Sequence, residues 1–161
     1  MSSDSSRDEL LQPVLRDTSS ISAAPYSVQA LFLTAFFGGP LAAVAMLATN
    51  SYRLRRAYKD LPMLLLGAAI FLVSAWIIYR TGAGVVLRDW LTQTLGQRGI
   101  QLFFRLEALA IAGGGYLLHR QEQRTSDLLG LKRPNGWIGG LACLALGIVL
   151  QVLIAVLLTA A

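Results

Sequence analysis

The chain has 161 residues, of which 55% are hydrophobic and only 14% are charged, and its formal net charge is +5. Soluble domains average about 25% charged residues, and a soluble fold of this size could not hide so many apolar side chains. The length leaves room for a single domain. Because the apolar residues come in long blocks, we expect an integral membrane protein.

Residues 1–27 are polar and rich in serine, with charges of both signs. Such a segment cannot bury enough apolar surface to fold, so we expect a mostly disordered tail. No apolar core of a signal peptide precedes Ala23 and Ala24. We therefore expect the first apolar block to be an uncleaved span.

Four apolar segments follow the tail, at about residues 28–49, 61–79, 100–118 and 137–159. Each would be roughly 28–34 Å long as a helix, close to the ~30 Å thickness of the hydrocarbon core. The sequence thus predicts an all-α fold, a four-helix transmembrane bundle over residues 28–161. The third segment is the least hydrophobic, because it contains Arg105 and Glu107.

The first span contains Gly38, Gly39 and Pro40 at its middle. A proline there removes a backbone hydrogen bond and predicts a helix kink. Such a kink accompanies some transporter sites, and it is also compatible with ordinary packing. Small residues at four-residue spacing predict close helix packing in the first and fourth segments, at Ala35, Gly39 and Ala43, and at Gly139, Cys143 and Gly147.

The second loop, residues 80–99, has an amphipathic pattern in which Leu87, Trp90, Leu91 and Leu95 recur at helical spacing. The pattern fits a short helix lying in the outer membrane interface. An ordinary capped connection between two spans fits it equally well, and the sequence leaves both interpretations open.

Basic residues are more frequent in the first and third loops than on the opposite side. The positive-inside rule therefore predicts that these loops are cytoplasmic and that both termini are not. The first loop carries Arg53, Arg55, Arg56 and Lys59, for which we expect anionic lipid headgroups as partners. Because the basic residues sit in short clusters beside the apolar blocks, without the regular aromatic interleaving that stacks bases, we expect no nucleic-acid partner.

With this topology, one polar residue from each span falls at a similar depth. Thr34, Ser74, Glu107 and Gln151 would lie about 8–12 Å below the outer edge. A buried carboxylate costs a few kcal/mol unless it faces protein or water or takes up a proton. Arg105 lies about 200° around the helix from Glu107 and is expected to snorkel to the headgroups.

Three interpretations of Glu107 remain open. It could couple protons or contact a substrate, with Gln151, Thr34 and Ser74 lining a shallow outer cavity. It could be a structural hydrogen-bond hub of the bundle. It could also lie near the interface, if the third span begins later than residue 100.

Motifs for chemistry are not evident. His119, the single histidine, stands three residues before Glu122, too few ligands for a metal site. No nucleophile elbow or phosphate-binding loop occurs, and Cys143 lies in an apolar span where a thiol is inert. We therefore expect no metal, no cofactor and no enzymatic activity.

Residues 36–42 read Phe-Phe-Gly-Gly-Pro-Leu-Ala, and they are followed by Asn50 and then by Tyr52 and Arg53. This run resembles small, uncharacterised bacterial membrane proteins whose first helix carries a Phe-x-Gly-x-Pro-Leu-Ala core and ends in asparagine before a basic loop. The resemblance implies the bacterial inner membrane. It implies no activity, substrate or cofactor.

Three classes of function fit these features. The first is an accessory or assembly subunit of a membrane complex, favoured by the small-residue faces and by the absence of a site. The second is an immunity-type protein that binds a toxin in or beside the bilayer. The third is a small oligomeric transporter or channel that uses Glu107.

Overall fold

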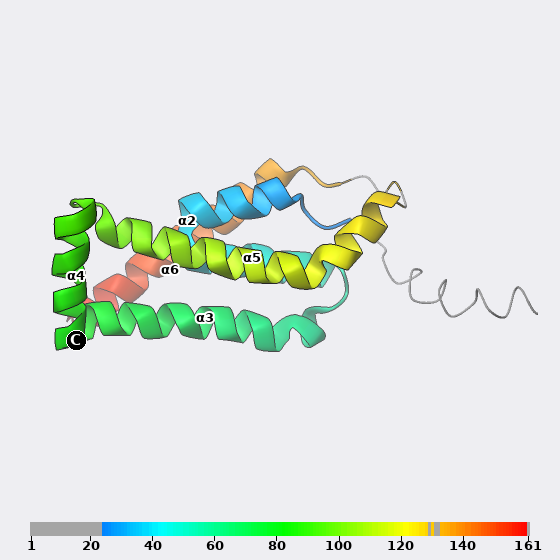
Figure 1. The fold of residues 1–161 in the computed structure, drawn as a ribbon. Coiled ribbons are helices and arrows are strands. Elements are labelled where there is room, and N and C mark those ends of the chain that lie inside the picture. The colour runs from blue at the N-terminus through cyan, green and yellow to red at the C-terminus, as the bar shows by residue number, and fades with distance from the viewer. Residues whose placement is uncertain (1–23, 129, 131–132, 161) are drawn as a thin grey trace, which may run out of the picture.

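The computed structural model describes residues 24–128, 130 and 133–160, so nearly all of the predicted tail lies outside the described residues. Within these ranges the fold is all-helical and consists of five helices, whose arrangement Figure 1 shows. They are α2 (Val28–Arg53), α3 (Ala57–Arg80), α4 (Gly82–Leu95), α5 (Gly99–Leu128) and α6 (Gly136–Ala160).

The sequence predicted four spans, and by length and composition three of these helices are apolar enough to cross a membrane. They are α2, α3 and α6. Helix α5 does not qualify, because Arg105 and Glu107 interrupt its apolar part and its last ten residues are mostly polar. The count of four apolar spans was therefore too high by this measure.

Helix α2 has the length of a span but does not run straight. A straight helix of 26 residues would be roughly 39 Å long, yet the Tyr26 backbone nitrogen donates a hydrogen bond to Asn50 Oδ1 at 2.8 Å. The helical course breaks at Gly39. Helix α2 is thus a hairpin with a first arm (residues 28–38) and a second arm (residues 40–53), and both of its ends lie toward the same end of the bundle (Figure 1).

The Gly39–Pro40 pair explains this turn. Gly39 has φ 77° and ψ −169°, a conformation that is essentially restricted to glycine. Pro40 then begins the second arm, where its fixed φ suits the first helical position and its missing N–H would have no partner in any case. The predicted kink at Gly38, Gly39 and Pro40 is therefore a reversal of chain direction.

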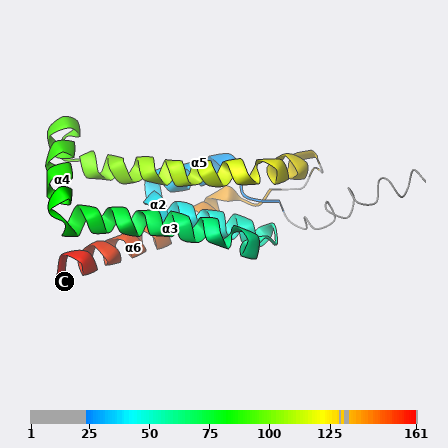
Figure 2. The same cartoon turned by 60° about the horizontal axis from the view of Figure 1, so that its bottom comes forward.

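Helices α3 and α5 run lengthwise along the bundle, α6 is inclined to both, and α4 lies across one end of α3 and α5 (Figures 1 and 2). The second loop thus contains a helix, as one of the two interpretations predicted. Thr81 caps it by accepting a hydrogen bond from the Gly84 nitrogen at 3.1 Å. Leu91 packs inward, whereas Trp90 and Leu95 are about half exposed.

The α2 hairpin forms the centre of the bundle and packs mainly against α6 and α5. Small residues allow the close approach, as predicted: a Cβ on Gly147 would lie 2.5 Å from the Ala42 Cβ, and one on Gly139 would overlap the Tyr26 ring. The buried core combines these helices and consists of Leu31, Ala35, Ala43, Met46, Leu47, Ala108, Ala112 and Cys143.

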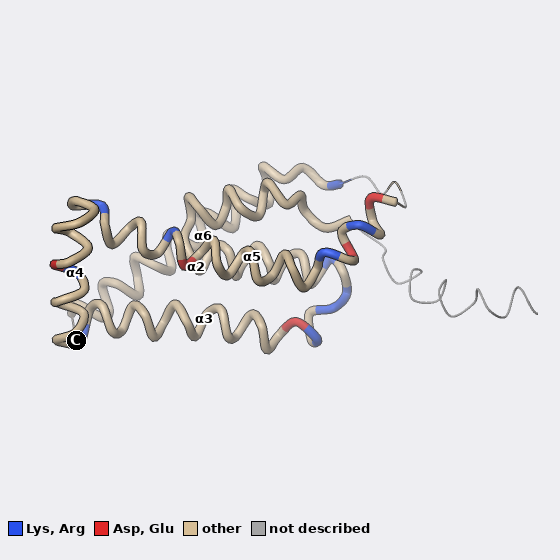
Figure 3. The backbone as a smooth tube through the Cα atoms, in the orientation of Figure 1, with Lys and Arg blue, Asp and Glu red and all other residues tan. Residues whose placement is uncertain are grey.

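Basic residues gather at the end of the bundle that holds the base of the hairpin (Figure 3). These residues are Arg53, Arg55, Arg56, Lys59, Arg120, Arg124 and Arg133. The C-terminal end of α6 lies at the opposite end, beside α4 (Figure 1). The topology derived from the sequence counted α2 as one crossing when it placed both termini on one side. In the structure, the two ends of α2 lie at the same end of the bundle.

Candidate functional site

The tip of the α2 hairpin is held by a side chain from α6. Gln151 Nε2 donates a hydrogen bond to the Gly38 carbonyl oxygen at 2.7 Å. The last carbonyls of a helix have no partner within it, so the first arm needs an external donor here. A Cβ on Gly39 would come within 2.4 Å of Gln151 Nε2, so a side chain at this position would displace the Gln151 amide besides straining the backbone.

A cavity of about 400 Å³ surrounds this tip, and we call it the tip cavity. Its polar lining residues are Tyr79, Gln101, Arg105 and Gln151, and its apolar lining residues include Phe36, Phe37, Phe104 and Ile148. The lining comes from the last turn of α3, the first turns of α5 and the distal part of α6. The tip cavity therefore lies between the hairpin tip and the end of the bundle that carries α4.

Arg105 faces the hairpin. Its guanidinium carbon lies 4.9 Å from the centroid of the Phe36 ring, within the range of a cation–π contact. Among the described residues, no carboxylate forms an ion pair with Arg105. The sequence predicted a side chain that extends to headgroups, and in the structure this side chain lines the tip cavity.

The four predicted polar residues do not form one cavity. Ser74 Oγ lies 3.0 Å from both carboxylate oxygens of Glu107, so these two residues pair with each other. Gln151 lines the tip cavity, and Thr34 lines a different pocket. The depth of Thr34 was counted from the wrong end: the hairpin begins at the basic end of the bundle, so Thr34 lies about 9 Å from that end.

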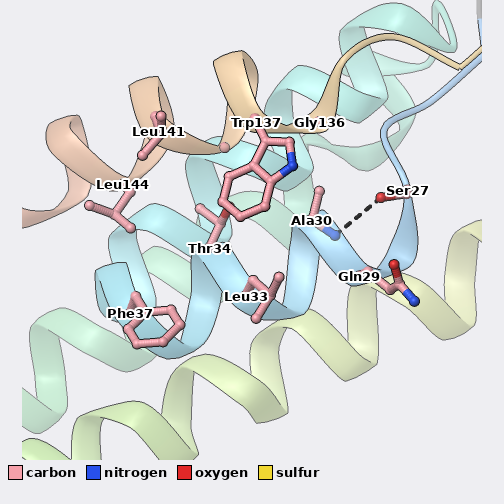
Figure 4. A pocket seen from close by; sticks show the side chains of 11 residues that line it. Ser27, Gln29, Ala30, Leu33, Thr34, Phe37, Gly136, Trp137, Leu141 and Leu144 are labelled. Atoms are coloured by element: carbon pink, nitrogen blue, oxygen red, sulfur yellow. Dashed lines mark hydrogen bonds between the residues drawn. The ribbon is translucent and has the colours of Figure 1, made fainter.

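This second pocket, of about 290 Å³, lies between the first arm of α2 and the start of α6, and we call it the base groove (Figure 4). Thr34 and Trp137 line it, and at its edge Ser27 Oγ accepts a hydrogen bond from the Ala30 nitrogen at 3.2 Å. A Cβ on Gly140 would lie 2.9 Å from Thr34 Oγ1, so α6 approaches the arm closely here.

The base of the hairpin is fastened by contacts between its two ends. Besides the bond from Tyr26 to Asn50, Arg53 Nε donates to the Ala24 carbonyl oxygen at 2.9 Å. The Arg53 guanidinium also lies 5.3 Å from the Tyr26 ring centroid. Of the four basic residues expected to face headgroups, Arg53 therefore has partners within the chain, while Arg55 and Lys59 are exposed.

Sequence reasoning missed a buried polar pair beside this base. His119 Nε2 lies 2.8 Å from Asp60 Oδ2, and the two residues are only 2% and 7% exposed. Arg56 forms an ion pair with Glu122 one helical turn along α5. In the sequence, His119 and Glu122 are three residues apart and therefore share one helix face, which was the available sign of this site. Their partners could not be predicted, because the contacts depend on the register between α3 and α5.

Within the described ranges, no three His, Cys, Asp or Glu side chains come together in a way that could hold a metal ion. The chemistry available at the tip cavity is hydrogen bonding and charge. Arg105 supplies a cation, and Gln101, Gln151 and Tyr79 supply neutral polar groups.

Searches of protein-family models, of curated proteins and of solved structures found nothing that matches the chain. The resemblance of residues 36–53 to small bacterial membrane proteins therefore remains a prediction.

Proposed function

We propose that this protein is a small membrane transport protein, a channel or a carrier, in which the α2 hairpin is a re-entrant element. The observation that supports the proposal most is that the hairpin tip, Gly38 and Gly39, lines the tip cavity. Each arm is about 16–21 Å long, which is roughly half to two thirds of the hydrocarbon thickness. Non-helical backbone at such depth is tolerated where it is buried in protein or lines a water-filled cavity.

In this proposal α3, α5 and α6 cross the bilayer, and α4 lies in the interface at one side. Helix α5 can cross despite its two charged residues, because Glu107 bonds to Ser74 and Arg105 lines the tip cavity. Both groups are thereby kept away from lipid, as is usual for ionisable residues within spans. The last third of α5 would extend into water at the basic end.

The orientation follows from charge. The basic end of the bundle would be cytoplasmic under the positive-inside rule. The chain would then enter α2 from the cytoplasm and end α6 on the opposite side, with the tip cavity open toward that side. A bacterial inner membrane is the setting that the first-helix resemblance implies.

Small re-entrant hairpins suit transport because the two half-helices direct backbone carbonyls and amides toward mid-membrane. Broken helices at substrate and ion sites of transporters work in this way. The bond from Gln151 to Gly38 would fix the hairpin in place, so that the tip separates the tip cavity from the base groove. Passage would require this barrier to open or a neighbouring copy to complete the path.

Flux through reconstituted protein tests this function. The full chain would be incorporated into liposomes, and uptake of a panel of small anions, cations and neutral solutes would be measured against protein-free vesicles. We expect protein-dependent uptake of at least one class, and Gln151→Leu should change its rate at least several-fold, while the exposed Gln93→Leu should not. Absence of uptake for every solute, with the protein inserted and folded, would rule the proposal out.

An accessory or assembly subunit is the second candidate. The observation in its favour is the apolar face of α6, where Ile138, Val149 and Leu157 are each more than 40% exposed. Such a face suits lipid or a partner helix. Cross-linking in native membranes through cysteines on this face would give a larger complex with other subunits if this candidate is right, and only monomers or self-adducts if it is not.

A further inference from the structure

We propose that the tip cavity binds a small carboxylate, with Arg105 as its main contact. The inference rests on the proposed transport function and names the chemical class of its solute.

The first argument is charge. No acidic residue lines the tip cavity, and within the described part of the chain Arg105 has no ion-pair partner. A cation that is partly removed from water in apolar surroundings is costly unless an opposite charge offsets it. A bound anion provides that charge, and a cation entering the same cavity would be repelled.

The second argument is the availability of donors. The contact of Arg105 with the Phe36 ring is not a hydrogen bond, and none of the side-chain hydrogen bonds found among the described residues involves its guanidinium. A guanidinium presents its N–H groups as a planar fork that fits the two oxygens of a carboxylate. Gln101 and Tyr79 line the same cavity without side-chain hydrogen bonds inside the described chain, and they can supply further donors.

The third argument is the shape and polarity of the walls. The cavity volume of about 400 Å³ is at the small end of ligand pockets. The lining also includes Phe36, Phe104 and Ile148, whose apolar surfaces suit a short alkyl chain. A ligand whose carboxylate binds the guanidinium, and whose alkyl chain of a few carbons contacts the apolar walls, is a short-chain monocarboxylate.

Binding can be measured without transport. The full chain in detergent micelles would be titrated with sodium butyrate by calorimetry, and with sodium chloride, sodium phosphate and butylammonium in parallel. We expect saturable butyrate binding, at least several-fold weaker binding of chloride and phosphate, and none of butylammonium.

The variant Arg105→Gln should weaken butyrate binding by about 10- to 100-fold, as expected for loss of a charged hydrogen bond. Arg88→Gln is the matched control, since Arg88 is exposed on α4 and does not line the cavity, and it should bind as the parent does. Should R105Q fail to fold, Arg105→Lys supplies the comparison, because it keeps the charge without the fork and should give intermediate affinity.

Undiminished butyrate binding by R105Q, equal binding of butylammonium or phosphate, or no butyrate binding at all would overturn the inference. The two proposals fail separately. Flux in liposomes without butyrate binding would support the transport function and overturn the carboxylate site. Butyrate binding without any flux would support the carboxylate site and overturn the transport function.

Discussion

The side chain of Gln151, on α6, donates a hydrogen bond of 2.7 Å to the carbonyl oxygen of Gly38, the last residue of the first arm of α2. The two residues are 113 positions apart. This bond ties the hairpin tip to a long apolar helix, and it gives a physical role to a glutamine that would otherwise be costly within a span.

Replacing Gln151 with leucine should destabilise the protein. The Gly38 carbonyl would lose its partner in a partly buried position, which costs about 1–3 kcal/mol. Thermal unfolding in detergent would measure the loss as a lower Tm. Gln93→Leu, on the exposed face of α4, is the control and should leave Tm unchanged. Equal Tm values for the two variants would mean that the bond does not hold the tip.

Replacing Gly39 with alanine should be more damaging than the same change elsewhere. The positive φ of Gly39 and the 2.4 Å approach of its added Cβ to Gln151 Nε2 both oppose a side chain. Gly113 is the matched control, since it lies within α5 with no atom within 4 Å of an added Cβ. Gly113→Ala should stabilise the helix by about 0.5–1 kcal/mol. A tolerated Gly39→Ala would contradict a sharp turn at this residue.

Ser74 and Glu107 should behave as partners. Ser74→Ala removes the hydroxyl bonded to the carboxylate and should cost about 1–3 kcal/mol, measured by thermal unfolding. Glu107→Gln keeps a group that can bond to Ser74, so it should fold normally. If E107Q accumulates at normal levels but loses flux, Glu107 acts in transport. If the protein itself is lost, Glu107 is a structural hub.

Asp60 and His119 should be strongly coupled. A double-mutant cycle with Asp60→Asn and His119→Gln should give a coupling free energy of about 0.5–3 kcal/mol, because the pair is buried and in contact. The pair Asp127 and Arg133 is the control, since it is exposed and should give about 0–1 kcal/mol. Coupling of the buried pair no larger than that of the exposed pair would contradict the packing of α3 on α5.

Much of the fold follows from local pattern. Hydropathy over 18 or more residues predicted the long helices. The spacing of Leu87, Trp90 and Leu91 made a helix in the second loop one of two open interpretations. Hydropathy does not show whether a helical segment reverses its direction, however. The two arms of the α2 hairpin together have the length and hydropathy of one span, so the sequence analysis counted them as one. The sequence Gly39–Pro40 is a helix stop followed by a helix start, and reading it in that way would have suggested two short helices.

The candidate site was predictable only in part. Gln151 and the Gly38–Pro40 turn were singled out separately, but their contact depends on how α6 lies against the hairpin. Thr34 was grouped with Gln151 because the sequence analysis counted depth along α2 as one straight span, whereas the chain reverses at Gly39 and the two residues line different pockets. The contact between Asp60 and His119 spans 59 positions, and only the relative register of two helices brings it about.

The distance between the two ends of α2 tests the central claim most directly. Spin labels would be attached to cysteines at Gln29 and Tyr52, both exposed, after Cys143→Ser removes the native thiol. The hairpin predicts a separation under about 20 Å in lipid, because packed helices lie 8–10 Å apart. A separation near 35 Å, the length of a straight helix between these residues, would contradict it.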